Sequence, residues 1–454
     1  MMAKLADLPN ELLEEILKHC PHEARVTFCL LSRHLNEVGT PLLYTEVMTQ
    51  SRSSLSKLCR TLMCSKKAAK SVRILSVNLT HEHTELKNFV DLVHRAVMPL
   101  SSIVSLCLVS TSTRNSESPN HDLVRRLLLN CHFPQLKGLK FTYFSSQKHN
   151  AALLKFLSRH SSISSLSISD TKAFPVAVEE EVFGTIQLPS LATFTGESHW
   201  LAAVALNVKL EVVNLLWRGL WVTPGEGPSS QQVAALDRTF YHLRRNSAES
   251  LMQLHLTAWA WDPLLIFICS ELPNLSELFV KVLSYDMESQ GETLDEDNSD
   301  FTRQFEKDAL PTLTKLRTLC VYQAHPDRNP SKLEQLRVVC RWASICPTLK
   351  AIMVSPSITW GKMEQIWQIM FNGVQGVAFS IAAIITGQYP DPGDIEGICL
   401  MPIVASLRHR FPRWEHERDL DALLREIILV LPPWASAGSI WSVYFSSTAL
   451  MAFL

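Results

Sequence analysis

The stretch that decides the fold is LADLPNELLEEILKHCPHEARVTFCLLSRHLNEVGTPLLYTEV, which runs from Leu5 to Val47. Its first part predicts a helix, since five apolar residues fall on one helical stripe: Leu12, Leu13, Ile16, Leu17 and Cys20. Asp7 can cap this helix, and Pro9 suits its first turn, where the missing N–H of a proline needs no partner. Pro21 ends the helix because a proline removes a helical hydrogen bond.

Two more helical segments follow in the same stretch. The pattern predicts a second helix from Ala24 to Leu31, and a third turn or helix from Ser32 that ends at Gly39. Three short helices in about forty residues cannot bury both faces of every helix, so we expect apolar surface to remain for a partner.

This stretch resembles the F-box, the helical motif that docks adaptor proteins onto the Skp-type linker subunit of a cullin-based ubiquitin ligase. The resemblance rests on four matching segments: Leu8-Pro9-Asn10-Glu11-Leu12-Leu13, Ile16-Leu17, Leu30-Leu31-Ser32-Arg33 and Pro41-Leu42-Leu43-Tyr44. The family usually has an aromatic residue just after the serine–arginine pair, whereas Leu35 stands near that place here, so we expect the third helix to pack differently. The resemblance implies eight residues that bind the linker subunit: Leu8, Pro9, Leu12, Leu13, Ile16, Leu17, Leu30 and Leu31.

Composition limits the class of protein. The 454 residues suffice for two or three domains or for one elongated repeat body. The 43 Lys and Arg residues nearly balance the 44 Asp and Glu residues, which argues against a dedicated nucleic-acid binder. Eleven cysteines, together with a first segment that has no apolar leader, predict a reducing compartment, either cytoplasmic or nuclear.

An apolar triplet recurs after the first stretch, with two and then one variable residue between its members. The copies are Val72/Leu75/Val77, Ile103/Leu106/Leu108, Leu136/Leu139/Phe141, Ile163/Leu166/Ile168, Leu191/Phe194, Leu210/Val213/Leu215, Leu251/Leu254/Leu256, Leu275/Leu278/Val280, Leu316/Leu319/Val321 and Leu349/Ile352/Val354. The last two positions place their side chains on one face of a short strand, and the first fills the turn before it. One such unit cannot bury its own core, so the units must stack.

The resulting fold prediction is an α/β chain, with a three-helix F-box-like motif at 1–48 and an irregular leucine-rich-repeat solenoid of parallel short strands and helical returns at 49–431. An apolar tail at 432–454 follows. A helix is expected at 51–70, and helical returns are expected at 120–131, 150–160, 231–246 and 263–271.

Loops are expected to interrupt the repeats at 113–120, at 223–231 and at 286–300. The last of these contains seven acidic residues and no basic ones, which predicts a solvated insertion, with an acidic recognition loop as the alternative.

The uncharged run from Gln365 to Pro390 is long enough to span a membrane, but its polar interruptions favour repeat core, with VAFSIAAI as a buried strand after a helix. A short amphipathic helix is expected at 419–431. The tail at 433–454 is uncharged, and we leave open whether it is a hydrophobic cap, a membrane anchor, disordered or an error of the gene end.

Residue patterns for catalysis or for cofactors are missing from the sequence. It contains no phosphate-binding glycine loop, nucleophile elbow or zinc-type histidine helix, so we expect no enzyme activity and no cofactor. Cys59 and Cys64 lack a second ligand pair, and His81 and His83 suit a solvated loop better than a metal site.

The function that these patterns predict is that of a substrate-recruiting adaptor of a Skp–cullin–F-box ubiquitin ligase. The N-terminal helices would bind the linker subunit, and the repeats would bind a protein target. The main alternative is a leucine-rich-repeat scaffold without a ligase, in which the N-terminal helices only cap the solenoid. A further alternative tethers such a scaffold to a membrane through the C-terminal tail.

Overall fold

The structure is a computed structural model of the whole chain. It describes residues 8–78, 87–109, 119–143, 147–170, 186–204, 208–217, 241, 243–258, 271–283, 305–324, 331–355, 358–363, 366–370, 374–388, 400–416 and 419–430. The chain forms two compact units, Met1–Ser247 and Ala248–Leu454. Each unit is described by itself.

The first unit begins with three helices, α1 (Asn10–His19), α2 (His22–Leu31) and α3 (Arg33–Tyr44), as the sequence predicts. Two details differ from the prediction. Pro9 takes the N-cap position of α1 without a side-chain hydrogen bond, while Asp7 lies outside the described residues. The third helix does not end at Gly39 but continues through Pro41 to Tyr44, because Gly39 serves a close approach between helices rather than a helix end.

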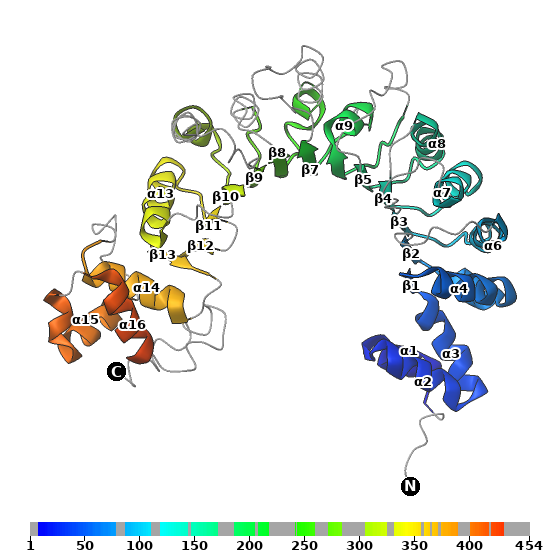
Figure 1. Cartoon of the computed structure of the whole chain (residues 1–454), viewed down its shortest axis with the longest axis horizontal. Coiled ribbons are helices and arrows are strands. Elements are labelled where there is room, and N and C mark those ends of the chain that lie inside the picture. Colours follow the sequence, from blue (N-terminus) through cyan, green and yellow to red (C-terminus); the bar gives the residue numbers. More distant parts are fainter. Residues whose placement is uncertain are drawn as a thin grey trace, which may run out of the picture. The chain divides into compact units, whose positions relative to one another are not determined.

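The strands of the first unit are all parallel and pair in chain order (Figure 1). They are β1 (Glu46–Thr49), β2 (Ile74–Asn78), β3 (Ser105–Val109), β4 (Gly138–Tyr143), β5 (Ser165–Asp170), β6 (Thr193–Glu197) and β7 (Val212–Trp217). The sequence did not predict β1, and the expected domain boundary at residue 48 falls inside this strand. Parallel strands need crossover connections, which the helices of the repeats supply.

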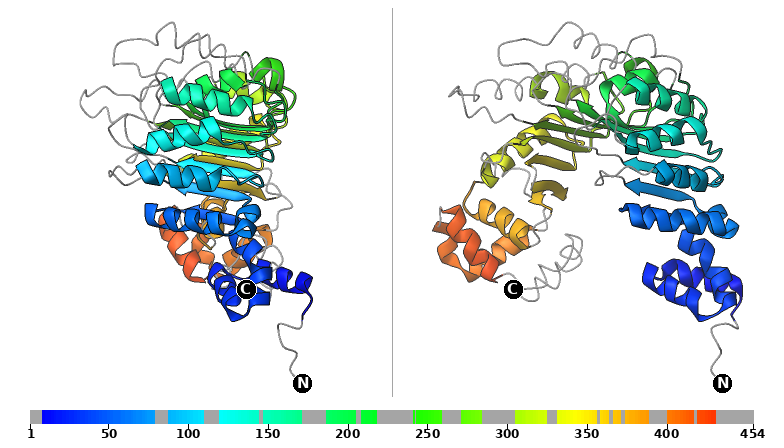
Figure 2. Two further views of the ribbon diagram at one scale, coloured as in Figure 1. Left: turned by 90° about the vertical axis from the view of Figure 1, so that its right-hand side faces the viewer. Right: turned by 45° about the vertical axis from the view of Figure 1, so that its right-hand side comes forward.

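Helices cover one side of these strands. They are α4 (Arg52–Cys64), α5 (Lys66–Ser71), α6 (Lys87–Val97), α7 (Pro119–Asn130), α8 (Gln147–Ser158) and α9 (Ser198–Val204). Figure 2 shows α4, α6, α7 and α8 side by side in that order as blue and cyan ribbons. The single helix expected at 51–70 is instead two helices, because Ser65 leaves helical geometry and its side chain caps α5 by accepting from the Ala68 N–H.

The ten copies of the apolar pattern, nine triplets and the pair Leu191/Phe194, coincide with strands β2 to β11 and supply the core of both units. Every member is buried except Val354, which is only half-buried. The register of β11 shifts between Met353 and Ser355, so that Ser355 takes the buried position in place of Val354. This irregularity marks the end of the regular repeats.

The second unit contains β8 (Gln253–Ala258), β9 (Glu277–Leu283), β10 (Thr318–Ala324) and β11 (Ala351–Ser355), which are parallel. Two antiparallel strands follow, β12 (Ile358–Met363) and β13 (Ile366–Ile369). Its helical segments are η3 (Phe305–Ala309), η4 (Leu310–Thr312), α13 (Lys332–Ile345), α14 (Val374–Ile385), α15 (Leu400–Arg410), η6 (Pro412–His416) and α16 (Leu420–Val430).

The prediction for the uncharged run was wrong in its detail. Its IWQI segment is strand β13, and VAFSIAAI lies within helix α14 rather than in a strand. Helix α14 packs against β13, α15 and α16, and so it can be apolar on nearly all sides without being exposed. None of the helices in the described part of the chain has the length and apolarity that a membrane-spanning helix needs.

Helices α7 and α8 confirm two of the helical returns, and α16 confirms the amphipathic helix near the C-terminus, with Leu423 and Ile427 buried. Most of the return expected at 231–246, and nearly all of that at 263–271, lie outside the described residues. The same holds for most of the loop expected at 113–120, for the loops at 223–231 and 286–300, and for the tail.

Candidate protein-docking site

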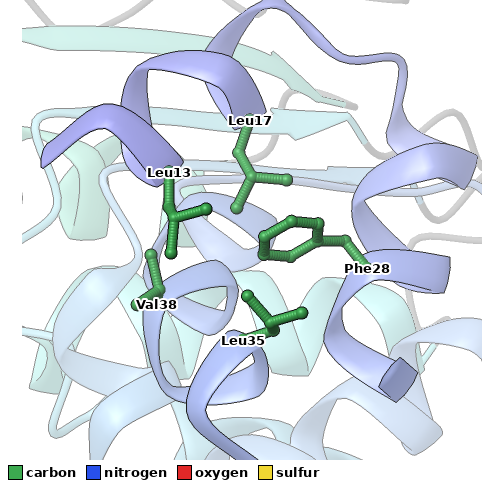
Figure 3. Packing of buried hydrophobic residues seen from close by; sticks show 5 residues of the cluster. All are labelled: Leu13, Leu17, Phe28, Leu35 and Val38. Atoms are coloured by element: carbon green, nitrogen blue, oxygen red, sulfur yellow. The ribbon is translucent and has the colours of Figure 1, made fainter. Parts of the chain in front are cut away.

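The three N-terminal helices have a small apolar core of their own. Figure 3 shows how its five buried members point toward one another from all three helices: Leu13, Leu17, Phe28, Leu35 and Val38. Leu8 and Leu42 pack against this cluster from its edge. Leu35 is 4% exposed, so it fills core space near the place where the resembled family usually carries an aromatic side chain. The helices are therefore held together by side chains that point inward.

Close approach of α2 and α3 depends on Gly39. A Cβ atom at this position would lie 2.5 Å from Cys29 Sγ, which is closer than real Cβ contacts allow. The same pair of helices is joined by Asn36, whose side-chain amide donates to the Cys29 carbonyl at 3.1 Å. Gly39 thus fixes how deeply α3 packs against α2.

Arg25 fixes the end of α1 relative to α2. Its guanidinium donates to the carbonyl oxygens of Lys18 and Cys20, both at 3.0 Å. Carbonyls at a helix end have no partner within the helix, so an arginine that supplies two donors satisfies them. The outward faces of the two helices are therefore presented in a fixed arrangement.

The outward faces of α1 and α2 carry apolar side chains that the three-helix core does not use. On α1, Leu12 is 52% exposed and Ile16 is 43% exposed. On α2, Leu30 is 79% exposed and Leu31 is 64% exposed. Four large apolar side chains left exposed on two short consecutive helices are typical of a protein-interaction site.

The eight predicted contact residues therefore divide into two groups. Leu12, Ile16, Leu30 and Leu31 are exposed, Pro9 is exposed at the N-cap of α1, and Leu8 is half-buried. Leu13 and Leu17 are fully buried in the helical core, at 0% and 1% exposed. A partner does not reach these two side chains unless the helices open, because each is enclosed by the other helices. The predicted stripe is thus half core and half surface.

Sequence reasoning missed one exposed apolar residue in this region. Val26 on α2 is 37% exposed and lies one helical turn before Leu30. The spacing of four residues between them could have revealed it. We call Leu12, Ile16, Val26, Leu30 and Leu31 the outer apolar residues.

The three N-terminal helices connect directly to the first repeat and pack against it. Helix α3 ends at Tyr44 and β1 begins at Glu46, and α3 also packs against α5. Pro41 has no N–H to offer the Glu37 carbonyl four residues earlier, and that carbonyl instead accepts a hydrogen bond from Lys67 Nζ of α5. The docking helices and the first repeat therefore share contacts within one compact unit.

The described residues contain no group of three or more His, Cys, Asp or Glu side chains that could hold a metal ion. Burial raises the pKa of the Cys59 thiol to about 12, which keeps it protonated, whereas Cys64 is exposed at the end of α4. His81 and His83 lie outside the described residues.

The chain has a helical docking module followed by a body of repeated strand–helix units. It therefore belongs to the class of repeat proteins with an N-terminal interaction motif. Comparison with family models identifies the motif itself, since the F-box domain model matches residues 5–42. A search of curated proteins finds no match to the chain.

The chain thus carries an F-box domain, followed by a body whose repeated units fit an irregular leucine-rich repeat. F-box domains generally bind Skp-type linker subunits, and F-box proteins are generally adaptors rather than enzymes. The domain therefore supports an adaptor role in ligases of the Skp–cullin–F-box type.

Proposed function

We propose that this chain is a substrate-recruiting adaptor of a Skp–cullin–F-box ubiquitin ligase. Its outer apolar residues contact the linker subunit, and its repeat body binds a protein target. The observation that carries this proposal is the exposure of Leu12, Ile16, Leu30 and Leu31 on helices whose core is already complete without them.

The energetics favour a partner on these helices. Complete burial of one leucine or isoleucine side chain contributes about 1.5–3 kcal/mol, so four such side chains provide a strong apolar anchor. They occupy two helices whose relative position is fixed by Arg25 and by the Gly39 contact, so little ordering entropy is lost on binding.

The adaptor performs no bond-making chemistry in this role. Ubiquitin transfer belongs to other subunits, and the adaptor accelerates it by holding the target near them. The direct connection from α3 into β1 supports such a role, because a short connection keeps a target bound to the repeats at a defined distance from the linker subunit.

The rival function is a scaffold in which the helices only cap the solenoid. The packing of α3 against α5 and β1 is what a cap would make. A cap normally presents a polar outer face, whereas α1 and α2 expose the outer apolar residues among their charged and polar ones, which favours docking. The three-part organisation into 1–48, 49–431 and 432–454 remains part of the proposal, and so does a cytoplasmic or nuclear location.

The test is co-purification of the full chain with a Skp-type linker subunit. A complex with one linker per chain, resolved by size-exclusion chromatography, is the expected result. If the folded full chain does not bind any Skp-type subunit, the helices are a cap and the ligase role is refuted.

A further inference from the structure

The face of the repeat sheet opposite the buried triplets changes character between the two units. In the first unit the middle row of this face is mostly polar. It begins at the exposed Met48 of β1 and continues through the registered neighbours Ser76, Cys107, Lys140, Ser167, Thr195 and Asn214. In the second unit the corresponding row is His255, Phe279, Cys320 and Met353. The second unit therefore presents a row of aromatic and sulfur-containing side chains, which we call the apolar row.

The apolar row is partly open on the sheet surface. His255, Phe279 and Met353 are each half-buried, while Cys320, which lies between Phe279 and Met353 in the same row, is 2% exposed. The rings of His255 and Phe279 lie 4.2 Å apart between centroids, so His255 supports the ring of Phe279. Burial lowers the pKa of His255, against an opposing effect of Glu277, which keeps this row uncharged at neutral pH.

Opposite charges flank the apolar row on β9. Side chains two residues apart share one face of a strand, so Glu277, Phe279 and Lys281 form a line, while Leu278 and Val280 point to the buried side. Glu277 and Lys281 are half-buried, and neither makes an ion pair with another residue of the described segments. Their registered neighbours Gln253, Thr318 and Thr257 are uncharged.

An extended peptide has the same two-residue period, about 6.6 Å between alternate side chains. We propose that this face binds an extended segment of the protein target that carries a basic, an apolar and an acidic side chain at alternate positions. The basic side chain pairs with Glu277, the apolar one packs on Phe279 and His255, and the acidic one pairs with Lys281. This inference deepens the recruitment role proposed above and rests on it.

The experiment measures binding of fluorescent peptides to the full chain by anisotropy at low ionic strength, without linker subunit. Three dodecapeptides serve as probes, with the cores Lys-Ser-Leu-Ser-Glu (mixed), Lys-Ser-Leu-Ser-Lys (basic) and Glu-Ser-Leu-Ser-Glu (acidic). The mixed peptide satisfies both charges in either chain direction, so wild type should prefer it over the other two by about tenfold. Phe279→Ala should weaken binding of all three.

Charge reversals give a test that unfolding cannot mimic. Glu277→Lys should come to prefer the acidic peptide, Lys281→Glu should come to prefer the basic one, and the double variant should return to the mixed peptide. A wild type that binds all three alike, or single variants that keep the wild-type preference, would overturn the inference. Linker binding is measured separately, so failure here would leave the docking proposal standing.

Discussion

The carbonyl oxygen of Glu37 accepts a hydrogen bond from Lys67 Nζ, which joins helix α3 of the F-box domain to helix α5 of the first repeat. This bond exists because Pro41 leaves that carbonyl without its helical partner. Pro41→Ala would restore the helical donor, so Lys67→Ala should then cost less stability than the same change in wild type. We expect Lys67→Ala alone to cost no more than about 1 kcal/mol. A double-mutant cycle on the unfolding of the full chain measures this coupling, and equal costs in both backgrounds would refute it.

Because Gly39 lies so close to Cys29, we expect a substitution of Gly39 to cost more stability than Lys67→Ala does. Gly39→Ala places a methyl group 2.5 Å from Cys29 Sγ and should destabilise the F-box domain by about 1–3 kcal/mol. Adding Cys29→Ala removes the sulfur and should recover most of the loss. Hydrogen exchange of residues 10–44 in the full chain reports the change. If Gly39→Ala leaves exchange unaltered, Gly39 does not set the packing of the helices.

His160 predicts a dependence of stability on pH. Its Nε2 accepts from the Phe133 N–H at 2.9 Å, and its ring stacks on Phe156 with centroids 4.0 Å apart. Burial lowers the pKa of His160, and the nearby His132 and Arg159 lower it further, although the Phe156 carbonyl opposes them. The unfolded chain therefore binds this proton more readily, and stability should fall as pH drops below about 6.5.

The control for this prediction is His160→Gln, which cannot titrate. The free energy of unfolding of wild type minus that of the variant should decrease between pH 7 and pH 5. A difference that stays constant, or that increases toward low pH, contradicts a neutral buried His160.

Two glutamates each accept hydrogen bonds from an arginine and from the tryptophan next to it in sequence, but the two glutamates differ in how exposed they are. Glu306 accepts from Arg341 Nε at 2.9 Å and from Trp342 Nε1 at 2.7 Å, while Glu426 accepts from Arg413 Nη2 at 2.6 Å and Trp414 Nε1 at 2.7 Å.

The side chain of Glu306 is 13% exposed and that of Glu426 is 44% exposed. Glu306→Gln should therefore cost about 1.5–3 kcal/mol, and Glu426→Gln should cost less than about 1 kcal/mol. Urea unfolding followed by tryptophan fluorescence compares them, and the reverse order would show that burial does not set the strength of these contacts.

The sequence predicted those features that local pattern determines. The apolar triplets located strands β2 to β11 because period and burial coincide in each unit. The F-box helices were predictable for the same reason. The sequence did not show which residues of the apolar stripe on α1 belong to the core and which to the surface. Leu12 and Leu13 are equally apolar, and only the positions of Phe28 and Leu35 decide that Leu13 is the one enclosed.

The errors came from contacts between different helices and strands, which local pattern does not reveal. Gly39 was predicted to end a helix, but its role depends on Cys29 in another helix. The segment around Phe379 was predicted as a strand because a short apolar run does not reveal its own period, and the covering helix α16 lies far along the chain. The apolar row was also missed, because only strand register brings His255 beside Phe279.

The most direct test of the central claim is the dissociation constant of the full chain for a Skp-type linker subunit, measured for wild type, Leu12→Asp and Leu429→Asp. Leu429 is a matched control, an exposed leucine on α16 of the second unit. Leu12→Asp should weaken binding at least about 30-fold without unfolding the chain, because an unpaired carboxylate would be buried at the interface, and Leu429→Asp should bind like wild type. Equal affinity of Leu12→Asp and wild type would contradict the account.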